Sequence, residues 1–284
     1  MFERFETSFA LARSSWQVLR TDKQLIVFPI LSGIGCLFVM AGFALPFIAR
    51  PQLLDFLNNN ANGVHPPIWA YVVAFAYYFC SYFVVIFFNA ALISCALIRF
   101  NGGTPTVGDG IQAAASRLPQ ILAWALVSAT VGVLLKMVEN AHEKAGAFIS
   151  AILGTAWTVI TFFVVPVLVV ERTGPIEAIK RSMSILKKTW GEALIGHFGI
   201  GFFMFLLALP GILLGVVSVA LLGVSAILGA VLIAVTVIYF LLLLVVGPAL
   251  NGIYLTALYQ YATNGEVPPG FDGREMKQAF RSKR

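Results

Sequence analysis

The chain alternates long apolar runs with short polar segments. A membrane-spanning helix needs about 20 apolar residues, and residues 193–265 carry no Asp, Glu, Lys or Arg and are long enough for two such helices. The predicted turn between these two is Gly223-Val224-Ser225, because glycine and serine favour turns. The pattern predicts an all-α polytopic membrane protein with six transmembrane helices, at about residues 25–49, 68–98, 121–138, 147–170, 193–221 and 226–250.

Two polar segments, residues 2–20 and 175–190, have helical periodicity. Apolar residues recur in them at steps of three and four, which places one apolar stripe along each helix. Such a helix lies at the headgroup level of a membrane, with its stripe toward the acyl chains. The first stripe is Phe2, Phe5, Phe9, Ala12 and Trp16, and the second is Ile176, Ile179, Met183, Leu186 and Trp190.

A serine precedes a tryptophan by eight residues at three places, each at the entrance to a pair of predicted spans. We interpret this as three pseudo-repeats, each an amphipathic surface helix plus two spans. The middle copy is degenerate, because Pro119 shortens its surface helix. The three pairs are Ser8/Trp16, Ser116/Trp124 and Ser182/Trp190.

Composition excludes a soluble protein. The chain is 59% hydrophobic and 11% charged, with a mean hydropathy of +0.89, whereas soluble domains carry about 25% charged residues. Residues 1–284 are predicted to form a single integral membrane domain. The N-terminus is not expected to be a cleavable signal, because a charged helix precedes a 25-residue apolar run. The three cysteines fall within spans, with no disulfide or metal-ligand spacing.

Positive charge is distributed unequally between the two sides of the predicted membrane topology. With six spans, sixteen of the nineteen Lys and Arg lie on the side of the two termini, including a basic tail at 270–284, and only Arg50, Lys136 and Lys144 lie on the other. The positive-inside rule therefore predicts that both termini are cytoplasmic, in a multi-pass protein of the cell membrane. The net charge of +6 then favours anionic lipid headgroups on the cytoplasmic face as partners and gives no reason to expect nucleic acid.

The candidate functional residues follow from this topology. The predicted lipid-headgroup contacts are Lys180, Arg181, Lys187, Lys188, Trp16 and Trp190. The alternative is that both surface helices only connect spans, with Trp as interfacial anchors. Asn89 and Asn251 are the candidate polar residues of the bundle interior, where an amide lines a passage or joins helices by hydrogen bonds.

The sequence does not favour catalysis. Ionisable residues do not cluster, and the Gly-x-Ser-x-Gly, His-Glu-x-x-His and phosphate-loop motifs are missing from the chain. Glu139 and His142 have the spacing of carboxylate-bridged metal sites, which need a second such pair that the sequence lacks. We therefore expect no catalytic residue, no metal site and no cofactor.

Two segments carry a resemblance to known families. The first is the string from Pro166 to Pro175, PVLVVERTGP, with Ala178, Arg181, Ser182 and Leu186 after it, and the second is the opening MFERF with Ser8, Trp16, Leu19 and Asp22. Together they resemble an uncharacterised family of six-span prokaryotic integral membrane proteins. The first also resembles the membrane domain that accompanies some glycerophosphodiester phosphodiesterases. The resemblance implies a membrane family without an assigned reaction, because the chain has no room for the soluble catalytic domain.

These observations favour a non-enzymatic membrane protein that interacts with lipids or organises the membrane. The alternative is a carrier or channel for a neutral or amphiphilic solute, because pairs of spans in repeats are common in transporters. Ion coupling is not expected, since no acidic or basic residue lies near the middle of a predicted span. The sequence leaves open whether a second membrane protein or a second copy of the chain is a partner.

Overall fold

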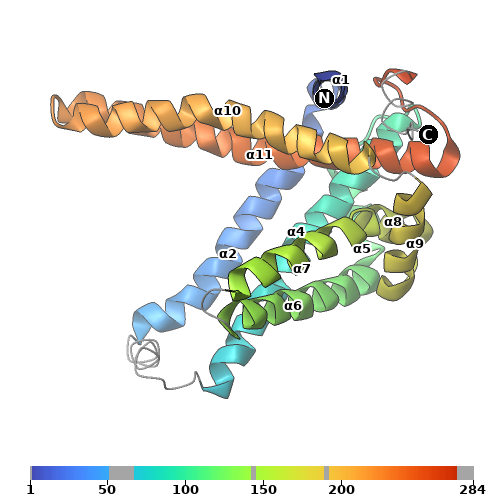
Figure 1. Ribbon diagram of the computed structural model, residues 1–284, viewed down its shortest axis with the longest axis horizontal. Coiled ribbons are helices and arrows are strands. Elements are labelled where there is room, and N and C mark those ends of the chain that lie inside the picture. The colour runs from blue at the N-terminus through green and yellow to red at the C-terminus, as the bar shows by residue number, and fades with distance from the viewer. Residues whose placement is uncertain (1, 51–66, 142–144, 189–191, 274–284) are drawn as a thin grey trace. The chain divides into compact units, whose positions relative to one another are not determined.

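The computed structural model describes residues 2–50, 67–141, 145–188 and 192–273. Every regular element in these ranges is a helix (Figure 1). Six stretches of the described chain are long and apolar enough to cross a membrane: Lys23–Ala49, Ile68–Phe100, Leu118–Asn140, Gly146–Glu171, Gly201–Leu222 and Ala226–Asn264. The predicted all-helical class and the six spans are therefore confirmed.

The chain divides into two compact units. The first comprises residues 1–30, 92–110 and 184–284, and the second comprises residues 31–91 and 111–183. Helix α4 (Ile68–Phe100) and helix α9 (Pro175–Lys188) each contribute residues to both units. The two units are described separately below.

The core of the first unit is built by helix α1 and the hairpin α10–α11. Helix α1 (Phe2–Thr21) contacts both α10 (Glu192–Leu222) and α11 (Ala226–Asn264). Leu11 and Leu19 of α1 and Tyr254 and Leu258 of α11 are fully or almost fully buried. Each buried large apolar side chain contributes roughly 1.5–3 kcal/mol of transfer free energy, so burial holds the second half of α1 in place.

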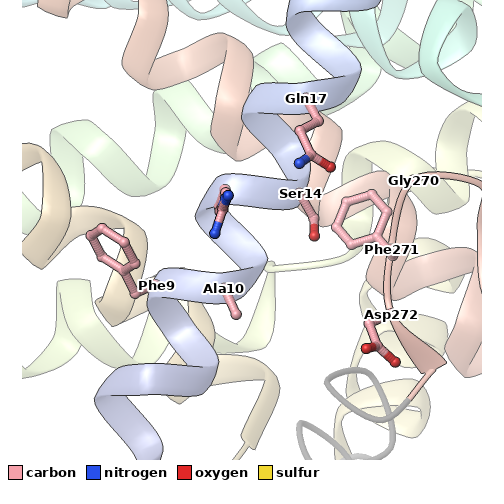
Figure 2. A pocket seen from close by; sticks show the side chains of 8 residues that line it. Phe9, Ala10, Ser14, Gln17, Gly270, Phe271 and Asp272 are labelled. Carbon is pink, nitrogen blue, oxygen red and sulfur yellow. The ribbon is translucent and has the colours of Figure 1, made fainter.

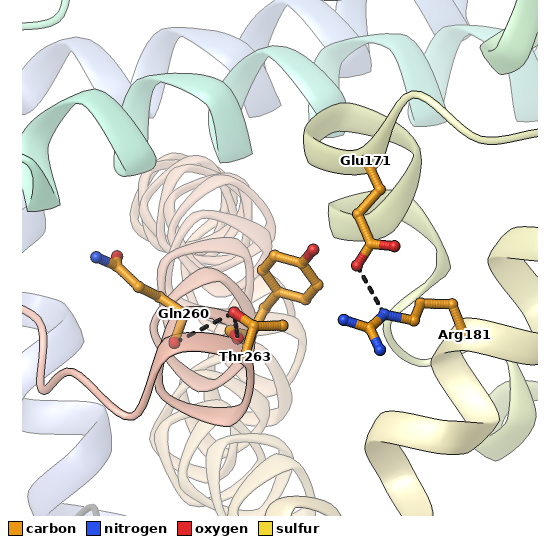
Figure 3. A network of polar contacts seen from close by, with 5 residues as sticks. Glu171, Arg181, Gln260 and Thr263 are labelled. Atoms are coloured by element: carbon orange, nitrogen blue, oxygen red, sulfur yellow. Dashed lines mark hydrogen bonds and ion pairs between the residues drawn. The ribbon is translucent and has the colours of Figure 1, made fainter.

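The turn between α10 and α11 lies where the sequence predicts it, at residues 223–225. The hydroxyl of Ser225 accepts a hydrogen bond from the backbone N–H of Leu228 (3.4 Å) and caps α11. The helix that contains the last predicted span, residues 226–250, is longer than that span: α11 continues to Asn264 and ends at Gly265, whose φ of 74° is left-handed. Thr263, one of the last residues, donates to the carbonyls of Tyr259 (2.8 Å) and Gln260 (3.3 Å), as Figure 3 shows.

The second unit contains most of α2 (Val27–Ala49), of α4 and of α9, with α6 (Leu118–Ala141), α7 (Gly146–Ile160) and α8 (Val164–Glu171) between them. Aromatic contacts join α2 to α4, for example Phe47 stacked on Trp69. Helices α6 and α7 form an antiparallel hairpin in which the rings of Trp124 and Trp157 stack at 5.7 Å. Trp124 is buried there, 4% exposed.

The fourth span is not the single helix predicted over residues 147–170. It consists of α7 and α8, separated by a turn at residues 161–163. Pro166 accounts for part of this break, because it has no N–H to donate to the carbonyl four residues earlier. The polar groups that the turn exposes are hydrogen-bonded by a serine of the next helix, described below.

The surface helix of the middle block is short. Helix α5 (Val107–Ala115) ends just before Ser116, and Pro119 occupies the first turn of α6, a position where proline is tolerated. Helices α1 and α9 are longer, at 20 and 14 residues. Helix α5 is therefore the shortest of the three, at nine residues.

Candidate functional site

The segment that joins α8 to α9, with both helices, forms a sharp corner, here called the α8–α9 corner (residues 164–188). Helix α8 ends at Glu171, and Arg172 follows with a left-handed φ of 57°. Pro175 is the first residue of α9, where its fixed φ suits a helix start. The N–H of Ala178 donates to the carbonyl of Gly174 (2.9 Å) and closes the first turn of α9.

An ion pair joins the two helices of the corner. The Nε of Arg181 donates to Oε1 of Glu171 at 2.8 Å, as Figure 3 shows. The side chains are 42% and 26% exposed, and a pair so exposed contributes at most about 1 kcal/mol. Its main effect is therefore to orient α9. The predicted headgroup residue Arg181 thus has a protein partner.

Ser182 connects α9 to the break in the fourth span. Its side chain is fully buried, and its hydroxyl donates to the carbonyl of Ile160 (2.7 Å). The same hydroxyl accepts from the N–H of Phe163 (3.0 Å). One side chain therefore satisfies a donor and an acceptor that the turn at 161–163 removes from the helical pattern.

Arg117, which sequence reasoning did not select, binds the end of α8. Its Nε donates to the carbonyl of Val169 (3.1 Å), and its Nη1 donates to the carbonyl (3.3 Å) and the hydroxyl (3.0 Å) of Ser116. A cation is favourable at a helix C-terminus. Partial burial, and then the nearby Arg172, lower the pKa of Arg117, which nevertheless stays protonated because guanidinium groups do not lose their proton in proteins.

The two faces of α9 differ in exposure. Ala178, Ser182 and Ile185 are buried, with exposures of 0–3%. Ile176, Lys180 and Lys187 are exposed, and their spacing of four and seven residues places them together on another face. Of the predicted apolar stripe, Leu186 is buried, Ile179 and Met183 are half-buried and Ile176 is exposed. The Lys188 side chain and Trp190 lie outside the described residues.

Helix α1, in the first unit, also buries a face beside its predicted stripe. Leu11, Ser15 and Leu19 are buried, whereas the stripe residues Phe9 and Trp16 are 57% and 43% exposed. The ring of Phe9 contacts that of Phe203 edge to face at 5.3 Å. The predicted headgroup residue Trp16 is therefore exposed on a helix whose other side packs in the unit.

A pocket of about 440 Å³ lies between α1 and the segment after α11 (Figure 2). It has a cation and an anion on opposite walls, in Arg13 of α1 and Asp272 of the later segment. Polar and aromatic side chains complete the lining, among them Ser14, Gln17, Phe9 and Phe271. Sequence reasoning missed this pocket because its walls are more than 250 residues apart.

A polar junction in the first unit was also missed. Nε of Arg99 lies 2.9 Å from Oδ2 of Asp22, and Oε1 of Gln24 accepts from the N–H of Val107 (3.1 Å). Thr106 and Asp109 form a reciprocal cap of α5, with Thr106 Oγ1 donating to Asp109 Oδ2 at 2.7 Å, and these hydrogen bonds lower the pKa of Asp109. The Thr-x-x-Asp spacing before α5 is the signal that could have revealed the cap.

The second unit has an apolar groove of about 620 Å³ between α2 and α4. Phe38, Phe43, Pro46 and Phe47 of α2 line one side, and Trp69 and Val73 of α4 line the other. The two asparagines selected from the sequence belong to different units. Asn89 is half-buried on α4 in the second, and Asn251 is half-buried on α11 in the first.

Glu139, the carboxylate of the Glu-x-x-His spacing, pairs with Lys136 at 2.9 Å. His142 lies outside the described residues. The described part of the chain holds no group of three or more His, Cys, Asp or Glu side chains placed to bind a metal ion.

Six apolar spans and polar corners at their ends define a multi-pass helical membrane protein. The chain belongs to a family of unknown function, DUF6159, whose model matches residues 68–270. This match includes the whole α8–α9 corner, which carries the first segment of the resemblance. No curated protein matches the chain, and no solved structure matches it.

Proposed function

We propose that this protein is a non-enzymatic membrane protein that binds anionic lipids through its surface helices and so organises the lipids around it. The membrane is the cytoplasmic membrane of a prokaryote, both termini are cytoplasmic, and the chain is built of three pseudo-repeats. The partners are anionic headgroups, and another membrane protein or a second copy can share the same surface.

The observation that carries this proposal is the attachment of α9 to the end of the fourth span. Ser182 and the pair Glu171–Arg181 hold α9 to α7 and α8. Three residues separate Glu171 from α9, and three residues reach at most about 10 Å. Helix α9 therefore begins close to the end of the fourth span, which is where lipid headgroups lie.

The exposed face of α9 suits that depth. Lys180 and Lys187 lie beside the exposed Ile176, so their ammonium groups can reach phosphates while their stems cover acyl chains. A lysine near an anionic membrane surface contributes about 1 kcal/mol of binding. This supports a lipid-facing role for α9 beyond that of a connecting helix, with Lys180 and Lys187 as the first contacts.

The repeat proposal is supported by aligned buried positions in α1 and α9. When Ser8 is aligned with Ser182, Leu11 corresponds to Ile185 and Ala12 to Leu186. All four of these side chains are buried. The buried positions of the two helices therefore correspond, as expected of two copies that dock on a pair of spans in the same way.

Lipid retention tests the proposal. The purified protein is placed in nanodiscs that contain equal amounts of phosphatidylglycerol and phosphatidylcholine. Native mass spectrometry of the protein released from these nanodiscs counts the lipids of each kind that stay bound to it. The double variant K180Q/K187Q should retain less phosphatidylglycerol, and K180R/K187R should behave like the wild type. K136Q is the control, because Lys136 is already paired with Glu139. An unchanged ratio in K180Q/K187Q would show the proposal to be wrong.

The alternative is a carrier or channel for a neutral or amphiphilic solute. It is favoured by the apolar groove between α2 and α4, which is large enough for one or more acyl chains. Flux of a neutral solute, or transfer of a labelled lipid between leaflets in protein-containing liposomes, would support this function. Substituting Gly42 in the groove wall by Leu should then slow the transfer.

A further inference from the structure

Two arginines flank adjacent spans of the second unit at the same end. Arg117 immediately precedes the third span, Leu118–Asn140, and Arg172 immediately follows the fourth, Gly146–Glu171. These spans are antiparallel in the α6–α7 hairpin, where Trp124 and Trp157 stack. Because the chain enters the hairpin at Arg117 and leaves it at Arg172, both guanidinium groups lie at one membrane surface.

Hydrogen bonds hold the guanidinium group of Arg117 beside the last turn of α8. Its Nε donates to the carbonyl of Val169, three residues before Arg172. Its Nη1 is engaged with Ser116. Among the described residues no hydrogen bond engages Nη2, so this part of the guanidinium group is available to a ligand.

The charge around this pair is unbalanced. Glu171 is the nearest carboxylate in sequence, and it pairs with Arg181. Within the described ranges no carboxylate forms an ion pair with Arg117 or Arg172, and the Arg117 guanidinium lies in the positive field of Arg172. Two close guanidinium groups repel each other, so an anion that binds between them gains energy from both.

Two further observations point to a bound oxygen anion. The hydroxyl of Thr173, next to Arg172, has its oxygen buried without a hydrogen-bond partner among the described residues. Arg172 adopts a left-handed φ of 57°, which costs an arginine more than a glycine or an asparagine. Glycine would end α8 at a lower cost than arginine does.

We propose that Arg117 and Arg172, with the Thr173 hydroxyl, form a binding site for a phosphate group, supplied by the headgroup of an anionic phospholipid. Guanidinium groups bind phosphate through paired hydrogen bonds. The site lies at the end of two spans, where lipid phosphates lie. This proposal deepens the lipid-binding function above and rests on it for the source of the phosphate.

Arg172→Gly is the variant that tests the site with the least damage to the fold. It removes the charge and the side chain, and glycine accepts the left-handed conformation. Arg172→Asn removes the charge and introduces a shorter side chain that also tolerates this conformation. Arg20→Gln, which removes an exposed cation of α1, is the matched control. Thermal unfolding of each variant shows whether its fold is retained.

The first experiment is native mass spectrometry of these proteins from nanodiscs of phosphatidylglycerol and phosphatidylcholine. The wild type and Arg20→Gln should retain one tightly bound phosphatidylglycerol per chain. Arg172→Gly and Arg172→Asn should bind it about tenfold more weakly, as expected for the loss of one charge-assisted contact. Equal retention by all four proteins, without a weaker site in either Arg172 variant, would overturn the proposal.

The second experiment identifies the source of the phosphate. Delipidated protein in detergent is titrated with glycerol 3-phosphate, against sodium chloride of equal ionic strength, while its thermal unfolding is followed. Stabilisation of the wild type that Arg172→Gly lacks would assign the site to soluble phosphate esters. Retention of the lipid without this stabilisation would assign it to headgroups. Either result supports the phosphate site.

The site and the broader function can fail separately. If K180Q/K187Q retains lipid normally while Arg172→Gly loses one phosphatidylglycerol, the α9 surface is wrong and the phosphate site stands. If K180Q/K187Q loses lipid and Arg172→Gly does not, the phosphate site is wrong and the α9 surface stands. The two variants share no residue, so their effects can be compared directly.

Discussion

The Nε atom of Arg99 lies 2.9 Å from the Oδ2 atom of Asp22, and this contact joins the segment after α1 to the end of the second span. It is an ion pair without a well-aligned hydrogen bond, because Oδ2 is buried and has no such partner. The side chains are 33% and 17% exposed. The pair therefore anchors the N-terminal helix to a transmembrane helix far along the chain.

We expect Asp22→Asn to lower the free energy of unfolding by about 1 kcal/mol, a value reduced by the partial exposure of both groups. A double-mutant cycle with Arg99→Gln, measured by reversible unfolding in mixed detergent micelles, isolates the pair. The coupling energy should be about 0.5–1 kcal/mol. Strictly additive effects would show that the contact contributes nothing.

Replacement of Ser182 by alanine should cost more, about 1–3 kcal/mol. The change removes the hydroxyl that bonds the buried N–H of Phe163 and the partly buried carbonyl of Ile160. Ser184→Ala is the control, since Ser184 lies on the same helix and is only half-buried, and it should change stability by less than about 0.5 kcal/mol. Equal effects of the two changes would contradict the role assigned to Ser182.

Glycine and alanine should differ at residue 172. Both remove the charge, but only alanine keeps a Cβ in the left-handed conformation at φ 57°, so Arg172→Ala should be about 1 kcal/mol less stable than Arg172→Gly. Thermal unfolding in one detergent measures the difference. If alanine were as stable as glycine, the residue would not need the left-handed conformation.

Gly211 permits close packing of α10 on α11. A Cβ at this position would lie 2.6 Å from Cε1 of Tyr239, and the hydroxyl of Tyr239 donates to the carbonyl of Leu207, which holds the ring in place. Gly211→Ala should therefore destabilise the hairpin by about 1–3 kcal/mol. Gly215→Ala should not, because its Cβ would meet Thr236 at an ordinary 3.5 Å.

The cap of α5 should give a dependence on pH. Hydrogen bonds from Thr106 lower the pKa of Asp109, so its contribution to stability is present above the ordinary pKa of aspartate and is lost as the pH falls through the lowered value. Asp109→Asn should remove this acid-dependent part. Unfolding curves at a series of acidic pH values would show it as a smaller difference between variant and wild type at low pH than at neutral pH.

The spans could be predicted because the thickness of the hydrocarbon core sets a minimum length for an apolar helix. The same rule does not predict where helices break or end. The turn at residues 161–163 is hydrogen-bonded by Ser182, a residue of the next helix. Helix α11 continues beyond the span predicted to end at residue 250, because a helix continues as long as its side chains have a core to pack against.

The candidate site was predictable only in part. Lys180 and Lys187 follow from the periodicity of α9, and both are exposed. Arg181 was grouped with them. Its ion-pair partner Glu171 belongs to the preceding helix, before Pro175, so the periodicity of α9 alone does not reveal the pair. Arg117 was missed because its hydrogen bond to Val169 connects residues 52 positions apart.

The length of helix α11 affects how it can respond to the bilayer. Its 39 residues extend over about 58 Å at 1.5 Å each, roughly twice the thickness of the hydrocarbon core. About 20 residues cross a hydrocarbon core, so nearly half of the helix is available to extend beyond it, and the part around Tyr254 and Leu258, after Pro248, is buried in protein. A long span responds to a thinner bilayer by tilting. Because the span and this buried part belong to one helix, such a tilt would also move the core that α11 forms with α1.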